Sequence, residues 1–301
     1  MQVVDQVAES PRTGIRAFLR LVMIEHSVFA LPFAYIAALT AMWRTTRSVH
    51  WVQLLLITVA MVSARTVAMS ANRILDREFD ALNPRTAKRE LVTGAMSVRS
   101  AWIGTVVALA IFLGSAAALS WLCLALAPVA VALLVLYSYG KRFTDFPQVL
   151  LALAQMVAPI GAWLAVTGHL SWISFALGLA VGTWIGGFDL IYSCQDVEVD
   201  RRIGIRSFPA RFGVSAALRT STAVHVGTFG AFAWFGAAAG LGWLWWLGLG
   251  LTALVLMYEH GIVRANDLSR VNRAFFTANG VIGIGLFAFA LADLITHGLG
   301  R

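Results

Sequence analysis

The chain has 301 residues, of which 59% are hydrophobic and 13% are charged. Soluble domains average about 25% charged residues, so this composition excludes an ordinary soluble enzyme and indicates an integral membrane protein. The formal net charge of +8 does not indicate nucleic-acid binding, because the basic residues lie in short loops between apolar segments, where they set membrane topology. The two cysteines, Cys123 and Cys194, are far apart, which argues against a disulfide framework and against a thiolate metal site.

Apolar segments long enough to cross a bilayer recur along the whole chain, since one span needs about 20 apolar residues. They predict an all-α bundle of nine transmembrane helices in a single domain covering residues 1–301. A short cytoplasmic segment, residues 1–15, precedes the first helix and lacks the pattern of a signal peptide. The nine predicted helices cover residues 16–41, 52–80, 99–119, 122–138, 148–167, 172–200, 216–237, 241–263 and 272–296.

Positive charge is distributed unequally between the two sets of loops. If the N-terminus is inside, almost all lysine and arginine residues outside the spans fall on the same side, and the opposite side holds only Arg44, Arg47 and Arg301. The positive-inside rule therefore predicts a multi-pass protein of the inner, cytoplasmic membrane, with its N-terminus in the cytoplasm and its C-terminus outside.

Two acidic motifs recur at the cytoplasmic ends of the second and sixth predicted helices. Each carries oxygen-bearing side chains four residues apart, and this spacing places them on one face of a helix. The first acidic motif comprises Asn72, Asp76 and Asp80, and the second comprises Tyr192, Asp196 and Asp200, with Asp189 one turn before Tyr192. Because each motif closes the second helix of a four-helix group, the chain is predicted to contain two related halves, residues 16–138 and 148–263, plus a ninth helix.

Carboxylate and amide oxygens at two facing helix ends suit a divalent cation. Mg²⁺ is held by one or two carboxylates together with phosphate oxygens and waters, so the two motifs could hold two Mg²⁺ ions with a diphosphate between them. The predicted metal ligands are Asn72, Asp76, Asp80, Asp196 and Asp200. For either motif alone, the alternative is a solvated acidic helix end stabilised by neighbouring arginines.

Basic side chains at the same membrane face could balance the phosphate charge that the metal ions leave uncompensated. The candidates are Arg77, Lys88, Arg89, Lys141, Arg142, Arg201 and Arg206. For each of them, the alternative is a loop charge that only sets topology. Lys141 and Arg142 stand out because they close the fourth predicted helix at this face.

Arg65 lies inside the second predicted helix, seven residues before Asn72. It therefore projects from nearly the same face, about 10 Å deeper in the membrane. An arginine at this depth needs an anionic partner, which is either a substrate or an internal ion pair. Glu25 and His26, in the first helix, are candidates for that partner or for contact with an acceptor substrate.

These motifs resemble those of the UbiA superfamily of intramembrane prenyltransferases. The resemblance extends over the whole chain and includes Arg65 before the first motif and the segment from Tyr137 to Thr144, with the pattern Tyr-Ser-x-x-Lys-Arg-x-Thr. Within the superfamily, the chain is similar to bacterial 4-hydroxybenzoate polyprenyltransferases. Glu25-His26-Ser27 and Asn83-Pro84-Arg85-Thr86 make it similar to MqnP-like members of menaquinone synthesis.

The resemblance implies that both acidic motifs bind Mg²⁺ and the diphosphate of a polyprenyl donor, and that Asp76 and Asp196 take part in catalysis. The acceptor would be a small aromatic compound such as 4-hydroxybenzoate, in ubiquinone or menaquinone biosynthesis. Loss of diphosphate would leave an allylic carbocation that the aromatic ring attacks. Asp189 is the candidate for orienting or deprotonating the acceptor. The lipid bilayer is the expected surrounding, and nothing indicates an obligatory protein partner.

Other functions share part of this pattern. A secondary transporter also combines repeated halves with kinked helices, but transporters place their binding groups near the bilayer midplane. Alcohol phosphotransferases of lipid synthesis also use paired aspartates, yet the Asp-Gly and Ala-Arg pairs of that family are absent from both acidic motifs. Prenyl transfer to haem, to a chlorophyll precursor or to a lipid glycerol uses the same apparatus and stays open.

Overall fold

The computed structural model describes residues 18, 21 and 31–300, apart from the side chains of residues 275 and 276. The structure leaves out most of the first part of the predicted helix over residues 16–41, as far as residue 30. Glu25 and His26 therefore lie outside the described residues. In the described part of the chain every regular element is helical, and the only β-type pairing is an isolated bridge between Arg264 and Asp267. The all-α prediction is therefore confirmed.

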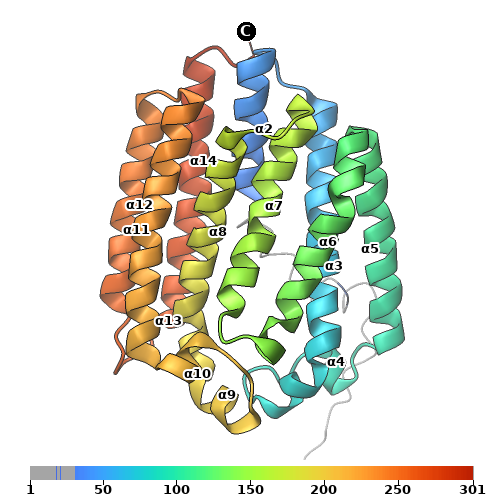
Figure 1. The fold of residues 1–301 in the computed structure, drawn as a ribbon, viewed down its shortest axis with the longest axis vertical. Helices are drawn as coiled ribbons and strands as arrows, with labels where there is room; N and C mark the ends of the chain where they lie inside the picture. Colours follow the sequence, from blue (N-terminus) through green and yellow to red (C-terminus); the bar gives the residue numbers. More distant parts are fainter. Residues whose placement is uncertain (1–17, 19–20, 22–30, 301) are drawn as a thin grey trace, which may run out of the picture.

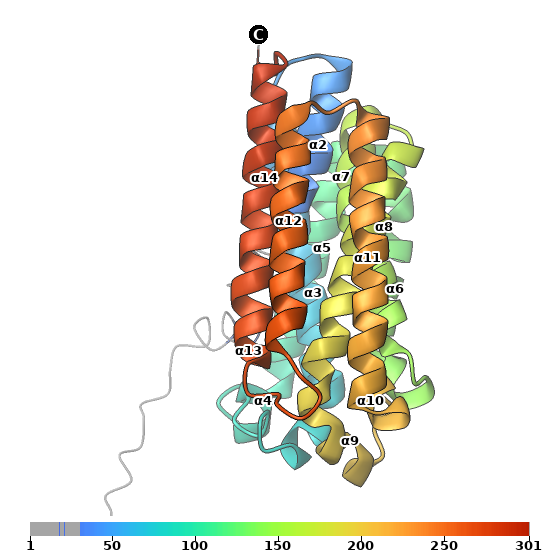
Figure 2. The same cartoon turned by 90° about the vertical axis from the view of Figure 1, so that its left-hand side faces the viewer.

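Long helices lie side by side along the long axis of the molecule, and short helices gather at one end (Figures 1 and 2). The long helices are α2 (Leu31–Thr45), α3 (Trp51–Leu82), α5 (Val98–Leu119), α6 (Trp121–Phe143), α7 (Pro147–Thr167), α8 (Trp172–Ser193), α11 (Val214–Ala239), α12 (Trp243–Ile262) and α14 (Asn279–Thr296). The short ones are α4 (Glu90–Thr93), α9 (Val197–Ile203), α10 (Phe208–Phe212) and α13 (Val271–Arg273).

The outer faces of the bundle are strongly apolar. Large hydrophobic side chains such as Trp51 on α3, Val106 on α5 and Leu254 on α12 are 75%, 60% and 61% exposed. A soluble protein rarely exposes so many apolar side chains together. Six helical stretches among the described residues are long and apolar enough to cross a bilayer, so the chain is an integral membrane protein whose exposed apolar side chains on these stretches, such as Val106, face lipid.

The helix that carries the second acidic motif is interrupted. α8 ends at Ser193, a 3₁₀ turn follows over Cys194–Asp196, and α9 begins at Val197. A 3₁₀ turn has about three residues per turn instead of 3.6, so a four-residue step through it does not return to the same face. The predicted span over residues 172–200 falls within one apolar helical stretch, Trp172–Ile203, but it contains this 3₁₀ turn. α3 carries the first acidic motif without a break.

The apolar core lies between α2, α7, α8, α11, α12 and α14. Its largest fully buried side chains include Phe33, Trp184, Phe232 and Trp245. Small residues let the helices approach closely, as is usual in membrane bundles: a Cβ atom added to Gly182 of α8 would lie 2.6 Å from a backbone oxygen of α7. This packing fixes α8 against α7 on one side and against α11 on the other.

Polar contacts hold α11 against the back of α8. Ser221 Oγ donates to the Gly187 carbonyl oxygen at 2.6 Å. His225 is buried, with Nε2 3.1 Å from the Trp184 carbonyl oxygen and Nδ1 2.8 Å from His260 Nε2. The imidazole therefore has little freedom to move.

We expect Gly187→Ala to destabilise the protein, because the added Cβ would lie 2.4 Å from ring atoms of His225. Overpacking of this kind costs about 1–3 kcal/mol. The measurement is the midpoint of thermal unfolding in detergent, with Gly227→Ala on α11 as the control, since a Cβ there meets no other atom within 4 Å. Equal midpoints for the two variants would contradict the described packing.

Candidate active site

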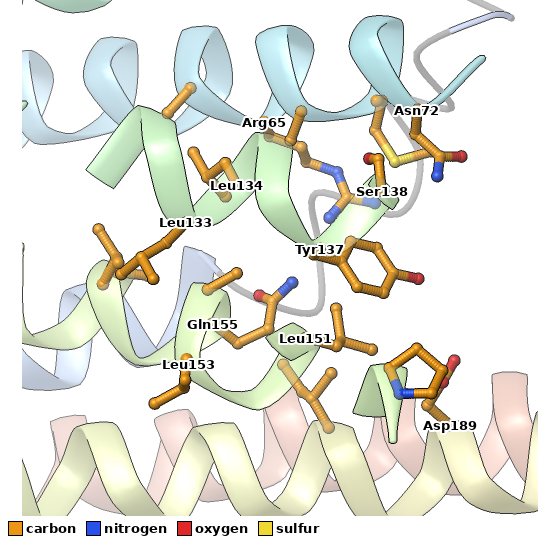
Figure 3. Close-up of a pocket in the computed structure, with 18 of the residues that line it drawn as sticks. Arg65, Asn72, Leu133, Leu134, Tyr137, Ser138, Leu151, Leu153, Gln155 and Asp189 are labelled. Carbon is orange, nitrogen blue, oxygen red and sulfur yellow. The ribbon is translucent and has the colours of Figure 1, made fainter. Parts of the chain in front are cut away.

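A cavity of about 1050 Å³ lies between α3, α5, α6, α7 and α8. Figure 3 shows that its lining changes along its length: Asn72 and Asp189 lie at one end, Leu133 and Leu153 lie toward the other, and Arg65 lies between them. Asp76, Asp80, Asp196 and Asp200 all line this cavity. The structure thus brings together the two acidic motifs, as the sequence predicts, and joins them to an apolar chamber.

The first acidic motif is paired with cations from neighbouring segments. Asp76 is only 2% exposed. Its Oδ2 accepts from Lys141 Nζ at 2.6 Å and from Asn72 Nδ2 at 3.0 Å. Asp80 accepts from Arg89 Nη1 at both oxygens, at 2.5 and 2.6 Å. These contacts place two predicted cations, Lys141 and Arg89, directly on two predicted metal ligands, Asp76 and Asp80.

The second acidic motif is held by the loop that follows α3. Arg85 forms a two-point contact with Asp196, from Nε to Oδ1 at 3.0 Å and from Nη2 to Oδ2 at 2.5 Å. Asn83 Nδ2 also donates to Asp196 Oδ1 at 3.0 Å, and Asp200 Oδ2 accepts from Ser207 Oγ at 2.8 Å. Partial burial lowers the pKa of Arg85, but its hydrogen bond to Asp196 and the charge of that carboxylate outweigh this and raise the pKa above its ordinary value.

Sequence reasoning gave Asn83 and Arg85 no site role, although both line the cavity. Their segment follows the first acidic motif directly, and a cation that close to an acidic motif is the signal that could have found Arg85. The guanidinium lies 5.3 Å from the centre of the Tyr192 ring, and Nη1 donates to the Tyr192 hydroxyl at 3.2 Å. Arg85 therefore links the loop after the first acidic motif to Tyr192 and Asp196 of the second acidic motif.

Because the sequence predicts diphosphate binding at this polar end of the cavity, Arg85→Ala is expected to raise KM for a diphosphate substrate about tenfold or more through loss of a charge-assisted contact. The effect on acceptor KM should be small. Steady-state kinetics with each substrate varied in turn would measure both constants. Arg211→Ala is the control, since Arg211 is an exposed arginine on α10 that does not line this cavity. Equal donor KM values in the two variants would contradict a role for Arg85 at the phosphate end.

Deeper in the cavity, Arg65 stands apart from the charged cluster. Its Nε atom is buried and makes no hydrogen bond within the described residues. Tyr137 and Ser138 of α6 line the cavity near it, and Ser138 Oγ is likewise buried without a partner (Figure 3). Asp189 of α8 and Gln148 of α7 line the same cavity, and Gln148 Nε2 donates to Ser193 Oγ at 3.4 Å. This part of the cavity therefore has unpaired polar groups facing an apolar chamber.

The other predicted cations fall into three groups. Lys88 and Arg206 line the cavity, and Arg206 also contacts Asp145 at 3.1 Å. Arg142 does not line the cavity, but its Nη1 lies 3.5 Å from Asp76 Oδ1. Arg77 and Arg201 are not brought to the cavity; they donate to the carbonyl oxygens of Leu91 at 3.0 Å and of Ala210 at 2.9 Å. The structure therefore gives these last two arginines the role of fixing local backbone.

The carboxylate and amide oxygens at the polar end of the cavity are the type of donor that Mg²⁺ prefers. Among the described residues, no three histidine, cysteine or acidic groups converge closely enough to hold a metal by themselves. Mg²⁺ does not need such a cage, since one or two carboxylates with phosphate oxygens and waters suffice. Asp76 Oδ1 is buried and accepts no hydrogen bond from the described residues, while Arg142 Nη1 lies 3.5 Å from it; an oxygen in that condition suits a cation. The residues present therefore fit Mg²⁺ that arrives with a diphosphate.

The fold and the cavity together define the class of protein: an integral membrane helical bundle with two acidic motifs at one end of a largely apolar chamber. The model of the UbiA prenyltransferase family matches residues 30–281. The chain belongs to the UbiA prenyltransferase family, and it is an enzyme of the prenyltransferase class.

Several curated relatives that match most of the chain are named 4-hydroxybenzoate octaprenyltransferase. A 4-hydroxybenzoate octaprenyltransferase of Xanthomonas campestris pv. campestris is 33% identical over 243 residues, which cover 80% of this chain and 79% of the relative. One from Acidovorax ebreus is 29% identical over 290 residues, covering 93% and 96%. These names describe the relatives.

Solved structures share the fold. The apo structure of a UbiA homologue from Aeropyrum pernix K1 has a TM-score of 0.81 and 35% sequence identity, and the match covers 90% of this chain and 98% of the homologue. A UbiA homologue from Archaeoglobus fulgidus bound to DMAPP and Mg²⁺ has a TM-score of 0.71 at 22% identity, covering 92% and 99%. The second likeness concerns the fold alone.

Proposed function

We propose that this enzyme transfers a polyprenyl group from a polyprenyl diphosphate to an aromatic acid such as 4-hydroxybenzoate, with Mg²⁺, in respiratory quinone biosynthesis. One observation carries the proposal: four carboxylates and their basic partners line the polar end of a cavity of about 1050 Å³ whose other end is apolar. That arrangement suits a molecule with an anionic head and a long hydrocarbon tail. The names of the curated relatives support the acceptor.

The phosphate end is proposed to lie between the two acidic motifs. When bound, Mg²⁺ would neutralise the diphosphate and stabilise its charge as it leaves, and a homologue with the same fold has been solved with DMAPP and Mg²⁺. The residues that would hold the ion are Asn72, Asp76, Asp80, Asp196 and Asp200. The cations that now contact these carboxylates are within reach of phosphate oxygens: Arg85, Arg89, Lys141 and Arg142.

The acceptor is proposed to lie deeper, between Arg65 and Asp189. Arg65 is the cationic partner for its carboxylate, since a guanidinium binds a carboxylate through two parallel hydrogen bonds. In the reaction the bond between the prenyl carbon and the diphosphate oxygen breaks, and the ring carbon beside the phenol hydroxyl forms the new carbon–carbon bond. The proton leaving that ring carbon passes to the Asp189 carboxylate, which acts as the base.

The membrane arrangement is part of the proposal. The enzyme is a single domain over residues 1–301, with nine spans, two related halves and a ninth helix. It lies in the inner membrane with its N-terminus and both acidic motifs on the cytoplasmic side and its C-terminus outside. The charge asymmetry of the loops supports this orientation. Glu90 of α4 and Asp200 of α9 line the cavity, and Figure 1 shows α4 and α9 at the same end of the bundle. A water-soluble aromatic acid and a membrane-embedded donor can meet there.

A membrane assay with radiolabelled polyprenyl diphosphate and 4-hydroxybenzoate tests the proposed function. We expect labelled organic-soluble product that requires both the acceptor and Mg²⁺ and that disappears when EDTA is added. A secondary transporter would instead move the label across the membrane without Mg²⁺ and without forming a prenylated product, and that outcome would overturn the proposal.

A further inference from the structure

Gln155 of α7 is a lone polar side chain in an apolar stretch. It lies between Ala154 and Met156, is partly buried and lines the cavity. The other three glutamines in the described part of the chain each donate a hydrogen bond within the protein: Gln53, Gln148 and Gln195. No such bond involves Gln155 among the described residues. An amide kept in an apolar chamber without a protein partner is available to a ligand.

Gln155 lies at the same level of the cavity as Arg65. Figure 3 shows the two side chains entering the cavity from opposite walls, Arg65 from α3 and Gln155 from α7. Gln155 follows Gln148 by seven residues, and Arg65 precedes Asn72 by seven residues, on helices that run in opposite directions. Each step corresponds to about 10 Å along a helix. The cavity therefore has an outer polar level at Asn72 and Gln148 and an inner polar level at Arg65 and Gln155.

The separation of these levels suits a short rigid molecule that is polar at both ends. From bond lengths of about 1.2–1.5 Å, a para-hydroxy aromatic acid measures about 6 Å from its phenol oxygen to its carboxylate oxygens. A hydrogen bond of about 2.8 Å at each end extends this to about 12 Å, close to the spacing of the two levels. A neutral acceptor would leave both inner polar groups unpaired, which is how a site rejects an analogue that lacks the matching group.

We infer that Gln155 and Arg65 together form the subsite for an anionic, planar substituent of the aromatic acceptor. Arg65 supplies the charge, and the Gln155 amide N–H donates to a carboxylate oxygen on the opposite side. Gln155 is thus a specificity-determining residue that selects aromatic carboxylates over neutral phenols. The inference rests on the proposed function and adds Gln155 to its acceptor site as the residue opposite Arg65.

Kinetics of Gln155→Leu test this role, because leucine has a similar size and suits a membrane helix. We expect KM for 4-hydroxybenzoate to rise about 10-fold to 100-fold, as for loss of a hydrogen bond to a charged group. KM for the polyprenyl diphosphate should stay within about twofold of wild type. Preference for 4-hydroxybenzoate over the neutral 4-hydroxybenzyl alcohol should fall by a similar factor. Gln155→Glu should impair use of the acid further, since two carboxylates would then face each other.

Gln53→Leu is the matched control, because Gln53 is also a glutamine on a spanning helix but does not line the cavity. Thermal shift of the purified variants with 4-hydroxybenzoate provides a second readout: the acid should stabilise wild type and Gln53→Leu, but not Gln155→Leu. Unchanged acceptor KM and selectivity in Gln155→Leu would overturn the inference, and so would a rise confined to the KM of the prenyl donor. If wild type prenylates no aromatic acid, the proposed function itself fails.

Discussion

Replacing Asp76 or Asp196 by alanine is expected to lower kcat/KM by about 10³-fold or more, because groups that stabilise developing charge act mainly in the transition state. Asp76 lies on α3 and Asp196 in the turn after α8, and both line the cavity. Each variant also leaves a cation, Lys141 or Arg85, without its carboxylate. The measurement is prenyl transfer at saturating Mg²⁺, with the midpoint of thermal unfolding recorded on the same preparations.

Glu78→Ala and Glu198→Ala are the matched controls. Both glutamates are exposed, lie on the segments that carry the two acidic motifs, and do not line the cavity. We expect them to retain wild-type turnover. Wild-type turnover in the Asp76 and Asp196 variants would show that the two motifs take no part in prenyl transfer.

Arg65→Ala is expected to raise acceptor KM by about 100-fold, the loss of a two-point contact with a carboxylate in a dry site. Thermal stability should stay the same or rise, because the variant removes a buried cation whose Nε atom has no partner among the described residues. Kinetics with acceptor and donor varied separately, together with thermal unfolding, measure both effects.

Arg65→Lys separates geometry from charge. Lysine keeps the charge but cannot form the two parallel hydrogen bonds of a guanidinium, so its acceptor KM should lie between those of wild type and Arg65→Ala. If instead Arg65→Ala lowers the unfolding midpoint and leaves all kinetic constants unchanged, Arg65 belongs to an internal ion pair and not to the acceptor site.

The two acidic motifs differ in how far their sequence spacing predicts their geometry. Asn72, Asp76 and Asp80 lie on one regular helix, so a step of four residues returns to the same face. The second motif passes through a 3₁₀ turn at Cys194–Asp196. That turn has no glycine or proline to mark it, so spacing alone predicts a continuous helix there.

Contacts between segments far apart in the chain could not be predicted from the spacing of residues within each motif. Arg85 reaches Asp196 from a loop 111 positions earlier in the chain, and helical periodicity relates only residues on one helix. Arg77 and Arg201 share the charge of the site cations, but they donate to backbone carbonyls and do not line the cavity. An arginine at the correct membrane face is therefore not enough to predict a site residue. The side of its own segment from which it projects decides whether it reaches the cavity.

Gln155 belongs to no sequence motif, although its position within an apolar span is visible in the sequence. A glutamine within an otherwise apolar span is costly unless it has a partner, but the sequence does not show whether that partner is protein or ligand. Only the arrangement of α3 and α7 around the cavity places it opposite Arg65 (Figure 3).

The mass of the product formed by purified enzyme tests the central proposal most directly. The enzyme in detergent or lipid would receive a polyprenyl diphosphate, Mg²⁺ and an equimolar mixture of 4-hydroxybenzoate, other aromatic acids and neutral phenols. The proposal predicts a product with the mass of an aromatic acid plus one polyprenyl group minus one hydrogen, absent with EDTA and with Asp76→Ala. Prenylation of the neutral phenols alone, or no prenylated aromatic product from active enzyme, would contradict it.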